Sequence, residues 1–279
     1  MVMNAKVIEI YNKGSERTIE LPSVFETPFR QNIIRKAFTN LASHSFQKQG
    51  RFPLAGEMVS AESRNTGLGI ARIARARGEG FARAGQAAGV SGVRHGRASH
   101  PPESWKHIYK KINKKENKLA LCSTIAATAN KGIIETRGHK VKNIVNFPIV
   151  VSNDIESVSN SKDLLRVFIS LGLEEELKRS KSSKKARTGK ARRRGRRSKV
   201  ATSALIAIGK DEGILRLSNS LPGIDIVKVN NLSVLDFTPQ SRGVRLTIYS
   251  ENAIKELSSL KTSLQILKEV ESSNEQERK

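Results

Sequence analysis

The stretch SALIAIG at residues 203–209 is a short, continuous apolar run that ends in glycine. Such a run, bounded by turn residues, is typical of a strand that is covered on both faces of a sheet. Similar runs are FPIVVS (147–152), IDIVKV (224–229) and VRLTIYS (244–250). Helical patterns alternate with these strands at 161–177, 211–219 and 251–270. The alternation predicts an α/β fold in which a mostly parallel sheet carries helices on both faces.

The N-terminal part of the chain adds to the same pattern. The spacing of apolar residues predicts strands at 5–11 and 17–21 and helices at 28–48 and 115–130. Thr27 and Pro28 are typical of a helix start, with threonine as the cap and proline at the first helical position. Cys122, the only cysteine, lies on the apolar side of its helix. It is therefore interpreted as a small buried side chain and not as a reactive thiol.

Between these regular stretches, residues 50–104 have neither a helical nor a strand period. Ten glycines fall between residues 50 and 97, and large apolar side chains are scarce there. An insertion of this length without periodicity is typical of a functional loop or a disordered linker. We predict one globular domain over 1–279, with 50–104 inserted as a long extended loop. The polar tail at 271–279 is expected to fray.

The charge of the chain is strongly positive, at +24 over 279 residues, which points to a polyanionic partner. Residues 178–199 hold thirteen basic residues and no acid, whereas residues 49–105 hold eight arginines and no lysine. Arginine pairs with phosphate through two parallel hydrogen bonds and stacks on bases, and glycine lets backbones approach closely. These properties favour an RNA partner. The alternative for 49–105 is a disordered Gly/Arg linker.

Motifs for catalysis, cofactors and metals are not found. The repeats GLGIAR (67–72) and GEGFAR (78–83) miss the third glycine of the dinucleotide fingerprint. His95, His100 and His107 do not have the spacing of a zinc site. The carboxylates at Glu174–Glu176 are interpreted as a solvated helix face. We therefore expect no enzyme activity, no cofactor and no metal. The single cysteine and the lack of a membrane-length apolar run predict a soluble, cytoplasmic protein.

Several long motifs resemble one known family. They are AESRNTGLGIARIARARGEGFARAGQAAG (61–89), RHGRASHPP (94–102) with Trp105, KLALCSTIAATA (118–129), GHKVKNIVNFPIVVS (138–152), ARTGKARRRGRR (186–197), LPGIDIVKVNNLSVLDFTP (221–239) and RLTIYSENAIKEL (245–257). In this order they resemble the L4 family of large-subunit ribosomal proteins, also called the L1/L4 family, in its archaeal and eukaryotic form. The resemblance extends from about Phe52 to Leu257.

The resemblance implies a structural constituent of the large ribosomal subunit that supports subunit assembly and translation. Its implied partners are large-subunit rRNA, neighbouring large-subunit proteins and the nascent peptide in the exit tunnel. A membrane and a second copy of the chain are not among them. The tunnel-constriction loop would hold Arg72, Arg75, Arg77, Gly78, Gly80 and Arg83. The rRNA-binding residues would be those arginines together with Arg64, Arg94, Arg97, Arg187, Lys190, Arg192, Arg193, Arg194, Arg196 and Arg197.

An alternative function is a free-standing nucleic-acid-binding enzyme or an RNA chaperone with a basic arm. An enzyme of this fold would place a catalytic motif at the carboxyl end of a strand. No such motif is found in the sequence, so the structural ribosomal function is preferred.

Overall fold

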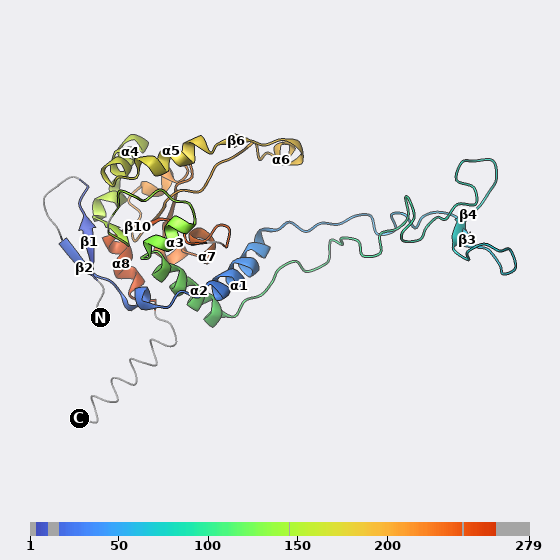
Figure 1. The fold of residues 1–279 in the computed structure, drawn as a ribbon, viewed down its shortest axis with the longest axis horizontal. Coiled ribbons are helices and arrows are strands. Elements are labelled where there is room, and N and C mark those ends of the chain that lie inside the picture. Colours follow the sequence, from blue (N-terminus) through green and yellow to red (C-terminus); the bar gives the residue numbers. More distant parts are fainter. Residues whose placement is uncertain (1–3, 11–16, 145, 242, 261–279) are drawn as a thin grey trace, which may run out of the picture. The chain divides into compact units, whose positions relative to one another are not determined.

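The structure is a computed structural model, which describes residues 4–10, 17–144, 146–241 and 243–260. The chain divides into two compact units. Unit 1 comprises residues 1–42 and 110–279, and unit 2 comprises Ser43–Tyr109. The inserted segment of the sequence thus corresponds closely to unit 2. Figure 1 labels the elements of both units along the chain.

Unit 1 is built on a six-stranded mixed sheet with the order β2-β1-β5-β10-β8-β9. The strands are β1 (Asn4–Ile8), β2 (Arg17–Glu20), β5 (Ile149–Val151), β8 (Leu205–Ile208), β9 (Asp225–Lys228) and β10 (Thr247–Ser250). Only β2 pairs antiparallel, with β1, and all the other pairs of neighbours in this sheet are parallel. The predicted α/β class with a mostly parallel sheet is therefore confirmed.

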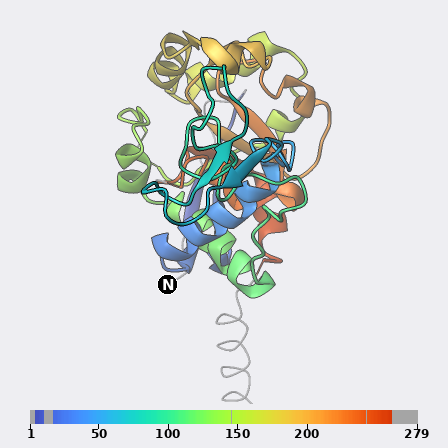
Figure 2. The same cartoon turned by 90° about the vertical axis from the view of Figure 1, so that its right-hand side faces the viewer.

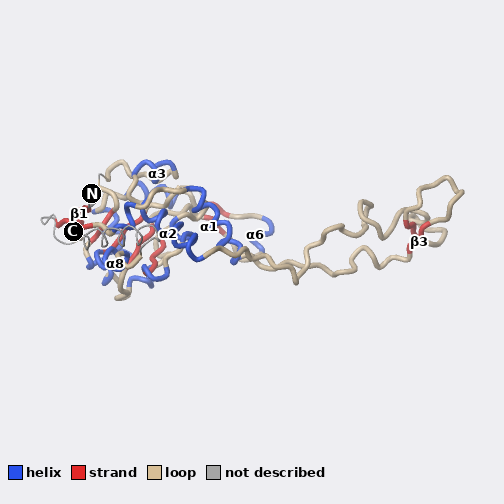
Figure 3. Tube along the Cα trace, turned by 90° about the horizontal axis from the view of Figure 1, so that it is seen from below, coloured by secondary structure: helices blue, strands red, loops and turns tan. Residues whose placement is uncertain are grey.

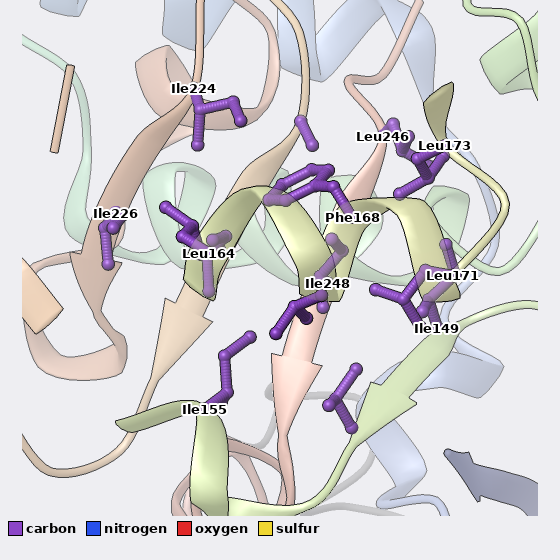
Figure 4. Close-up of a cluster of buried hydrophobic side chains, with 14 of the residues drawn as sticks. Ile149, Ile155, Leu164, Phe168, Leu171, Leu173, Ile224, Ile226, Leu246 and Ile248 are labelled. Carbon is purple, nitrogen blue, oxygen red and sulfur yellow. The ribbon is translucent and has the colours of Figure 1, made fainter. Parts of the chain in front are cut away.

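Both faces of this sheet are covered by apolar packing. Successive side chains of a strand point to opposite faces, so Ile149 and Val151 join one hydrophobic cluster and Val150 joins the other. On the first face, Leu164 and Phe168 of α4 (Ser161–Ser170) pack over the strands (Figure 4). The second face is covered by α2 (Lys114–Ala127), α7 (Val234–Phe237) and α8 (Glu251–Leu257). Cys122 is buried in this second cluster, as predicted.

The predicted helix over 28–48 begins later and ends earlier in the structure. Helix α1 spans Gln31–Ala42 and packs against α2. Thr27 does not cap it, because Thr27 ends a short 3-10 helix, η1 (Ser23–Glu26). The hydroxyl of Ser123 instead donates to the carbonyl of Pro28 and accepts from the N–H of Arg30, at 3.0 and 2.8 Å. Tertiary contacts therefore override the local start signal.

The predicted helix over 161–177 is two helices, α4 and α5 (Glu174–Ser182). The chain turns at Gly172, whose φ is +73°. The N–H of Leu173 bonds the carbonyl of Phe168 and that of Gly172 bonds the carbonyl of Ile169, which is a Schellman stop.

The remaining elements of unit 1 are short. The pattern at 211–219 forms only a 3-10 helix, η4 (Ile214–Leu217), and the predicted helix at 251–270 ends as α8 at Leu257. Residues 261–279, which include the predicted tail, lie outside the described residues. The other short elements are α3 (Lys131–Thr136), η3 (Asn153–Ser157) and η5 (Val229–Asn231).

Unit 2 consists almost entirely of loops and turns (Figure 3). It begins with a 3-10 turn, η2 (Ser43–Ser45), and holds two short antiparallel strands, β3 (Ala61–Ser63) and β4 (Ala74–Ala76) (Figure 2). The prediction of no regular structure between 50 and 104 was therefore wrong at these strands. Their side chains are small or charged, so no apolar alternation marks them in the sequence. Residues 44–109 are all described, and none of them is buried.

Candidate nucleic-acid interface

Most of the basic run at 178–199 forms a hairpin in unit 1, and its first residues, 178–182, belong to α5. The hairpin contains strands β6 (Lys185–Ala186) and β7 (Ser198–Lys199), with helix α6 (Gly189–Arg193) between them. The two strands are paired antiparallel, and the N–H of Arg187 bonds the carbonyl of Arg197 at 2.8 Å. We refer to residues 183–200 as the basic hairpin.

The basic hairpin presents its charges to solvent. Six of the seven predicted binding residues on it are exposed, and Arg187 is half-buried; the six are Lys190, Arg192, Arg193, Arg194, Arg196 and Arg197. In the part of the chain that the structure describes, no salt bridge joins any of the seven to an acid. Such unneutralised cations are what phosphate groups bind.

The base of the basic hairpin is fixed by the hydroxyls of Ser180, in α5, and Ser183, the C-cap of α5. The hydroxyl of Ser180 lies 3.0 Å from the carbonyl oxygen of Ala201 and 2.6 Å from that of Pro222. The hydroxyl of Ser183 accepts from the N–H of Ala201 at 2.8 Å. These bonds join the chain that enters the hairpin to the chain that leaves it. The hairpin therefore projects from a defined point of unit 1.

Glu176 lies at the centre of a buried polar network beside this base. Its carboxylate accepts from His139 Nδ1 at 2.7 Å, from Ser203 Oγ at 3.1 Å and from the N–H of Lys140 at 3.0 Å. Arg179 donates two further bonds, at 2.9 and 2.6 Å. Burial by itself would raise the pKa of Glu176, but the bonds from Arg179 and His139 outweigh it and lower the pKa to about 2.

His139 completes this network as a neutral imidazole. Burial lowers its pKa despite the hydrogen bond to Glu176. The N–H of Leu246 points to Nε2 at 3.4 Å, so Nε2 is the acceptor and Nδ1 carries the proton that it donates to Glu176. The interpretation of Glu174–Glu176 as a solvated face was therefore wrong for Glu176, which is fully buried, while Glu174 and Glu175 are exposed. With five bonds to protein atoms, its carboxylate cannot serve as an acid or a base for a substrate.

Arg245 holds the other side of the same base. It is buried, pairs with Asp225, and donates to the carbonyls of Ser203, Ala204 and Gly223. Gly223 has a φ of +74°, and a Cβ there would lie 2.2 Å from the carbonyl oxygen of Ala201. Only glycine fits this close approach of two backbones. The sequence did not indicate a role for His139 or Arg245: both lie in stretches that carry the family resemblance, but neither belongs to a charge run or to a pattern that marks a buried polar contact.

Unit 2 carries the other predicted arginines, and the structure divides them into two groups. Arg77, Arg83 and Arg94 line one cavity, together with His95 and Phe81. Arg64, Arg72, Arg75 and Arg97 do not line it. Arg75 donates to the carbonyl of Gly85 at 3.0 Å, and Arg97 lies 3.8 Å from Glu57. Gly78 and Gly80 adopt φ values of +92° and +81°, which the backbone of this turn requires.

The two Gly-x-Gly repeats do not form a cofactor site in unit 2. GEGFAR (78–83) follows β4 (Ala74–Ala76) closely, but no helix follows it in residues 78–109. A dinucleotide phosphate site needs that helix N-terminus. In the described ranges, no three His, Cys, Asp or Glu side chains gather as a metal site requires. No helix among the same residues is long and apolar enough to cross a membrane.

The family of the chain follows from its similarity to known proteins. A family model described as the Ribosomal protein L4/L1 family matches residues 19–260. The chain belongs to this family.

Archaeal members of the L4/L1 family are similar to nearly the whole chain. Proteins named large ribosomal subunit protein uL4 are 40% identical in Methanococcus vannielii, 39% in Archaeoglobus fulgidus and 36% in Methanosphaera stadtmanae. Each alignment covers 91% of this chain and 96–98% of the relative. Membership of the L4/L1 family confirms the resemblance and the prediction of a structural ribosomal protein, and it excludes the enzyme among the alternatives.

Proposed function

We propose that the chain is built into the large ribosomal subunit and binds large-subunit rRNA at two places, the basic hairpin and unit 2. The observation that carries the proposal is the exposed set of cations on the hairpin, which have no acidic partners among the described residues. Each phosphate that such a cation neutralises releases counterions, which favours binding. The archaeal relatives are named as large-subunit proteins, which supports the same site of action.

The two places suit two kinds of contact with RNA. The basic hairpin is dense in charge and fixed at its base, so it serves as an anchor for which phosphate contacts suffice. Unit 2 is rich in glycine and arginine and lacks a core of its own. In the assembled subunit it acts as an extended loop that reaches between rRNA segments. Its residues Arg72, Arg75, Arg77, Gly78, Gly80 and Arg83 lie at the wall of the peptide exit tunnel, where the nascent peptide passes.

The proposal is tested by sedimentation of a lysate from cells that express the tagged full chain. Nearly all of the protein is expected to travel with large subunits, and to remain there in a high-salt wash. A variant with Arg192, Arg193 and Arg194 changed to Gln should dissociate at lower salt. A wild-type protein found mainly in the free fraction would contradict the proposal and favour an RNA chaperone.

Deletion of residues 67–90 tests the role of unit 2 separately. The deleted chain is expected to stay attached to rRNA through the basic hairpin, because the network around Glu176 is untouched. Ribosome profiling should then show altered pausing at sequences that arrest in the exit tunnel. Unchanged pausing in subunits that carry the deleted chain would speak against the tunnel role alone.

A further inference from the structure

Unit 2 contains a cavity of about 420 Å³, within the size range of small-ligand sites. Its charged and aromatic lining comprises Arg77, Arg83, Arg94, His95 and Phe81. The other residues around it are neutral and mostly small: Val59, Ser60, Ala76, Gln86, Ala87, Ala88 and Gly89. The lining thus includes three arginines and one phenylalanine, and it includes no acidic residue.

The walls of this cavity are held by backbone pairing. Strand β4 pairs with β3 on one side and bonds residues 85–88 on the other. The bonds on that side join Ala76 N to the carbonyl of Gln86 at 2.9 Å, and Ala88 N to the carbonyl of Ala74 at 2.9 Å. Beyond this strand-like stretch, a tight turn over Val93–Gly96 carries Arg94 and His95, and His95 has a φ of +62°. The cavity therefore lies against an ordered three-stranded arrangement and not in an irregular coil.

The side chains that line the cavity differ in whether other residues of the protein already bind or cover them. Arg77 forms a salt bridge with Glu62, so part of its charge is neutralised. Arg83 and Arg94 are exposed, and no described residue pairs with either guanidinium. Phe81 is 48% exposed, although a phenyl ring gains by leaving water. Two cations without partners and a half-exposed ring beside the same cavity suit a ligand that is both anionic and aromatic.

A nucleotide is the ligand that combines these properties. Its phosphate suits a guanidinium fork, and its base suits stacking on a phenyl ring. A free phosphate ion would leave Phe81 without a function, and an acidic peptide would not require the ring either. Sequence-specific recognition of RNA favours unstacked bases in loops and bulges, which a side chain can cover.

We propose that this cavity receives one unstacked nucleotide of large-subunit rRNA, with its base on the ring of Phe81 and its flanking phosphates on Arg83 and Arg94. The proposal rests on the proposed function, since it names the element of rRNA that unit 2 recognises. It also divides the arginines of unit 2 by role. Arg83 and Arg94 bind at a built site, whereas Arg64 and Arg72 contact the RNA backbone outside it.

The test uses large subunits purified from cells that express the full-length variants, so that unit 2 is studied in place. The variants are Phe81→Ala, Arg83→Gln and Arg94→Gln, with Phe52→Ala as the matched control. Phe52 is also in unit 2 and is 57% exposed, but it does not line the cavity. The rRNA of each particle is probed by acylation of its 2′-hydroxyl groups and read by reverse transcription.

Loss of one stacking partner changes the binding of a base by roughly five- to 150-fold. We therefore expect Phe81→Ala to raise the reactivity of one nucleotide at least about fivefold, with Arg83→Gln and Arg94→Gln acting on the same nucleotide or its neighbours. Phe81→Trp should restore the wild-type pattern, because it restores the stacking ring. Phe52→Ala should not affect that nucleotide.

The outcomes separate this proposal from the proposed function. Particles that carry Phe81→Ala at normal levels, with the reactivity pattern of the Phe52→Ala control, would overturn the nucleotide site and leave the ribosomal function intact. Scattered changes that differ between Phe81→Ala and Arg94→Gln would also overturn it. A wild-type chain absent from the subunits would instead overturn the proposed function itself.

Discussion

The two units of the chain use arginine in opposite ways. In unit 1, Arg245 is buried and its guanidinium is fully engaged with Asp225 and three backbone carbonyls. In unit 2, Arg83 and Arg94 are exposed, with no partner among the described residues. A buried charge is tolerated only when the protein supplies its partners, so Arg245 stabilises the fold. An exposed arginine without partners contributes little to folding and remains available for a ligand.

The same contrast holds for the apolar side chains. Among the residues that the structure describes, all three hydrophobic clusters lie in unit 1. Unit 2 exposes Phe46, Phe52, Phe81 and Trp105 instead. Without buried apolar area, unit 2 gains little free energy to offset the conformational entropy of ordering its backbone. Unit 1 should therefore hold its fold alone, while unit 2 depends on its RNA partner.

Limited proteolysis of the RNA-free chain should give the largest difference between the units. Trypsin is expected to cut after the arginines of unit 2 at least about a hundredfold faster than within the sheet of unit 1, because unit 2 has no buried core to oppose local opening of its short backbone pairing. The fragments are identified by mass spectrometry over a time course. Addition of large-subunit rRNA should slow the cuts in unit 2. Equal protection of both units without RNA would refute this dependence.

Replacement of Glu176 by Gln tests the buried network of unit 1. The pKa of Glu176 is about 2, against a usual value of 4.5, so its charged form contributes about 3 kcal/mol to stability at pH 7. We expect Glu176→Gln to lower the free energy of unfolding by about this amount, as measured by denaturant titration. The control is Glu174→Gln on the same helix, whose pair with Lys178 is exposed to solvent and should contribute far less to stability than the buried network.

The pH dependence of that difference has a definite sign. A carboxyl group whose pKa is lowered on folding stabilises the protein above its unfolded pKa, and this contribution is lost as the pH falls towards the folded pKa. The difference in the free energy of unfolding between wild type and Glu176→Gln should thus be constant near neutral pH. It should narrow as the pH falls from about 4.5 towards 2. A gap that stays constant down to pH 3 would show that the carboxylate is not responsible.

The sequence was sufficient to predict the elements whose apolar residues follow a regular pattern. The apolar runs located β5, β8, β9 and β10 within a few residues, because strands covered on both faces need such runs. The predicted ends of some elements differ from those in the structure, because tertiary contacts determine them. An example is the start of α1, beside which Ser123 binds the backbone of Pro28 and Arg30. The runs of basic residues located the two basic segments in the sequence. They did not predict that one segment forms a hairpin and that the other lines a cavity.

Single buried polar residues were beyond sequence reasoning. His139, Glu176 and Arg245 are far apart in the chain, and only the packing of α5 against the amino ends of the strands brings them together. Phe81 is one of nine phenylalanines, and its position beside Arg83 and Arg94 depends on the return of residues 85–88 along β4. No spacing rule describes such contacts. The motifs that carried the family resemblance did locate the basic residues, which are repeated and exposed.

Arg179 and Arg192 form the finest test of the comparison, because both belong to one basic run but play opposite roles. Arg179 is bound to Glu176 and to the carbonyl of Thr202, whereas Arg192 is exposed on α6. Arg192→Gln should change the free energy of unfolding by less than about 0.5 kcal/mol. It should also reduce the slope of log K against log salt for an rRNA fragment by about 0.7–0.9. Arg179→Gln should do the reverse, lowering stability and leaving the slope unchanged. If both variants reduced the slope equally, position in the charge run, and not the buried network, would determine the role of each arginine.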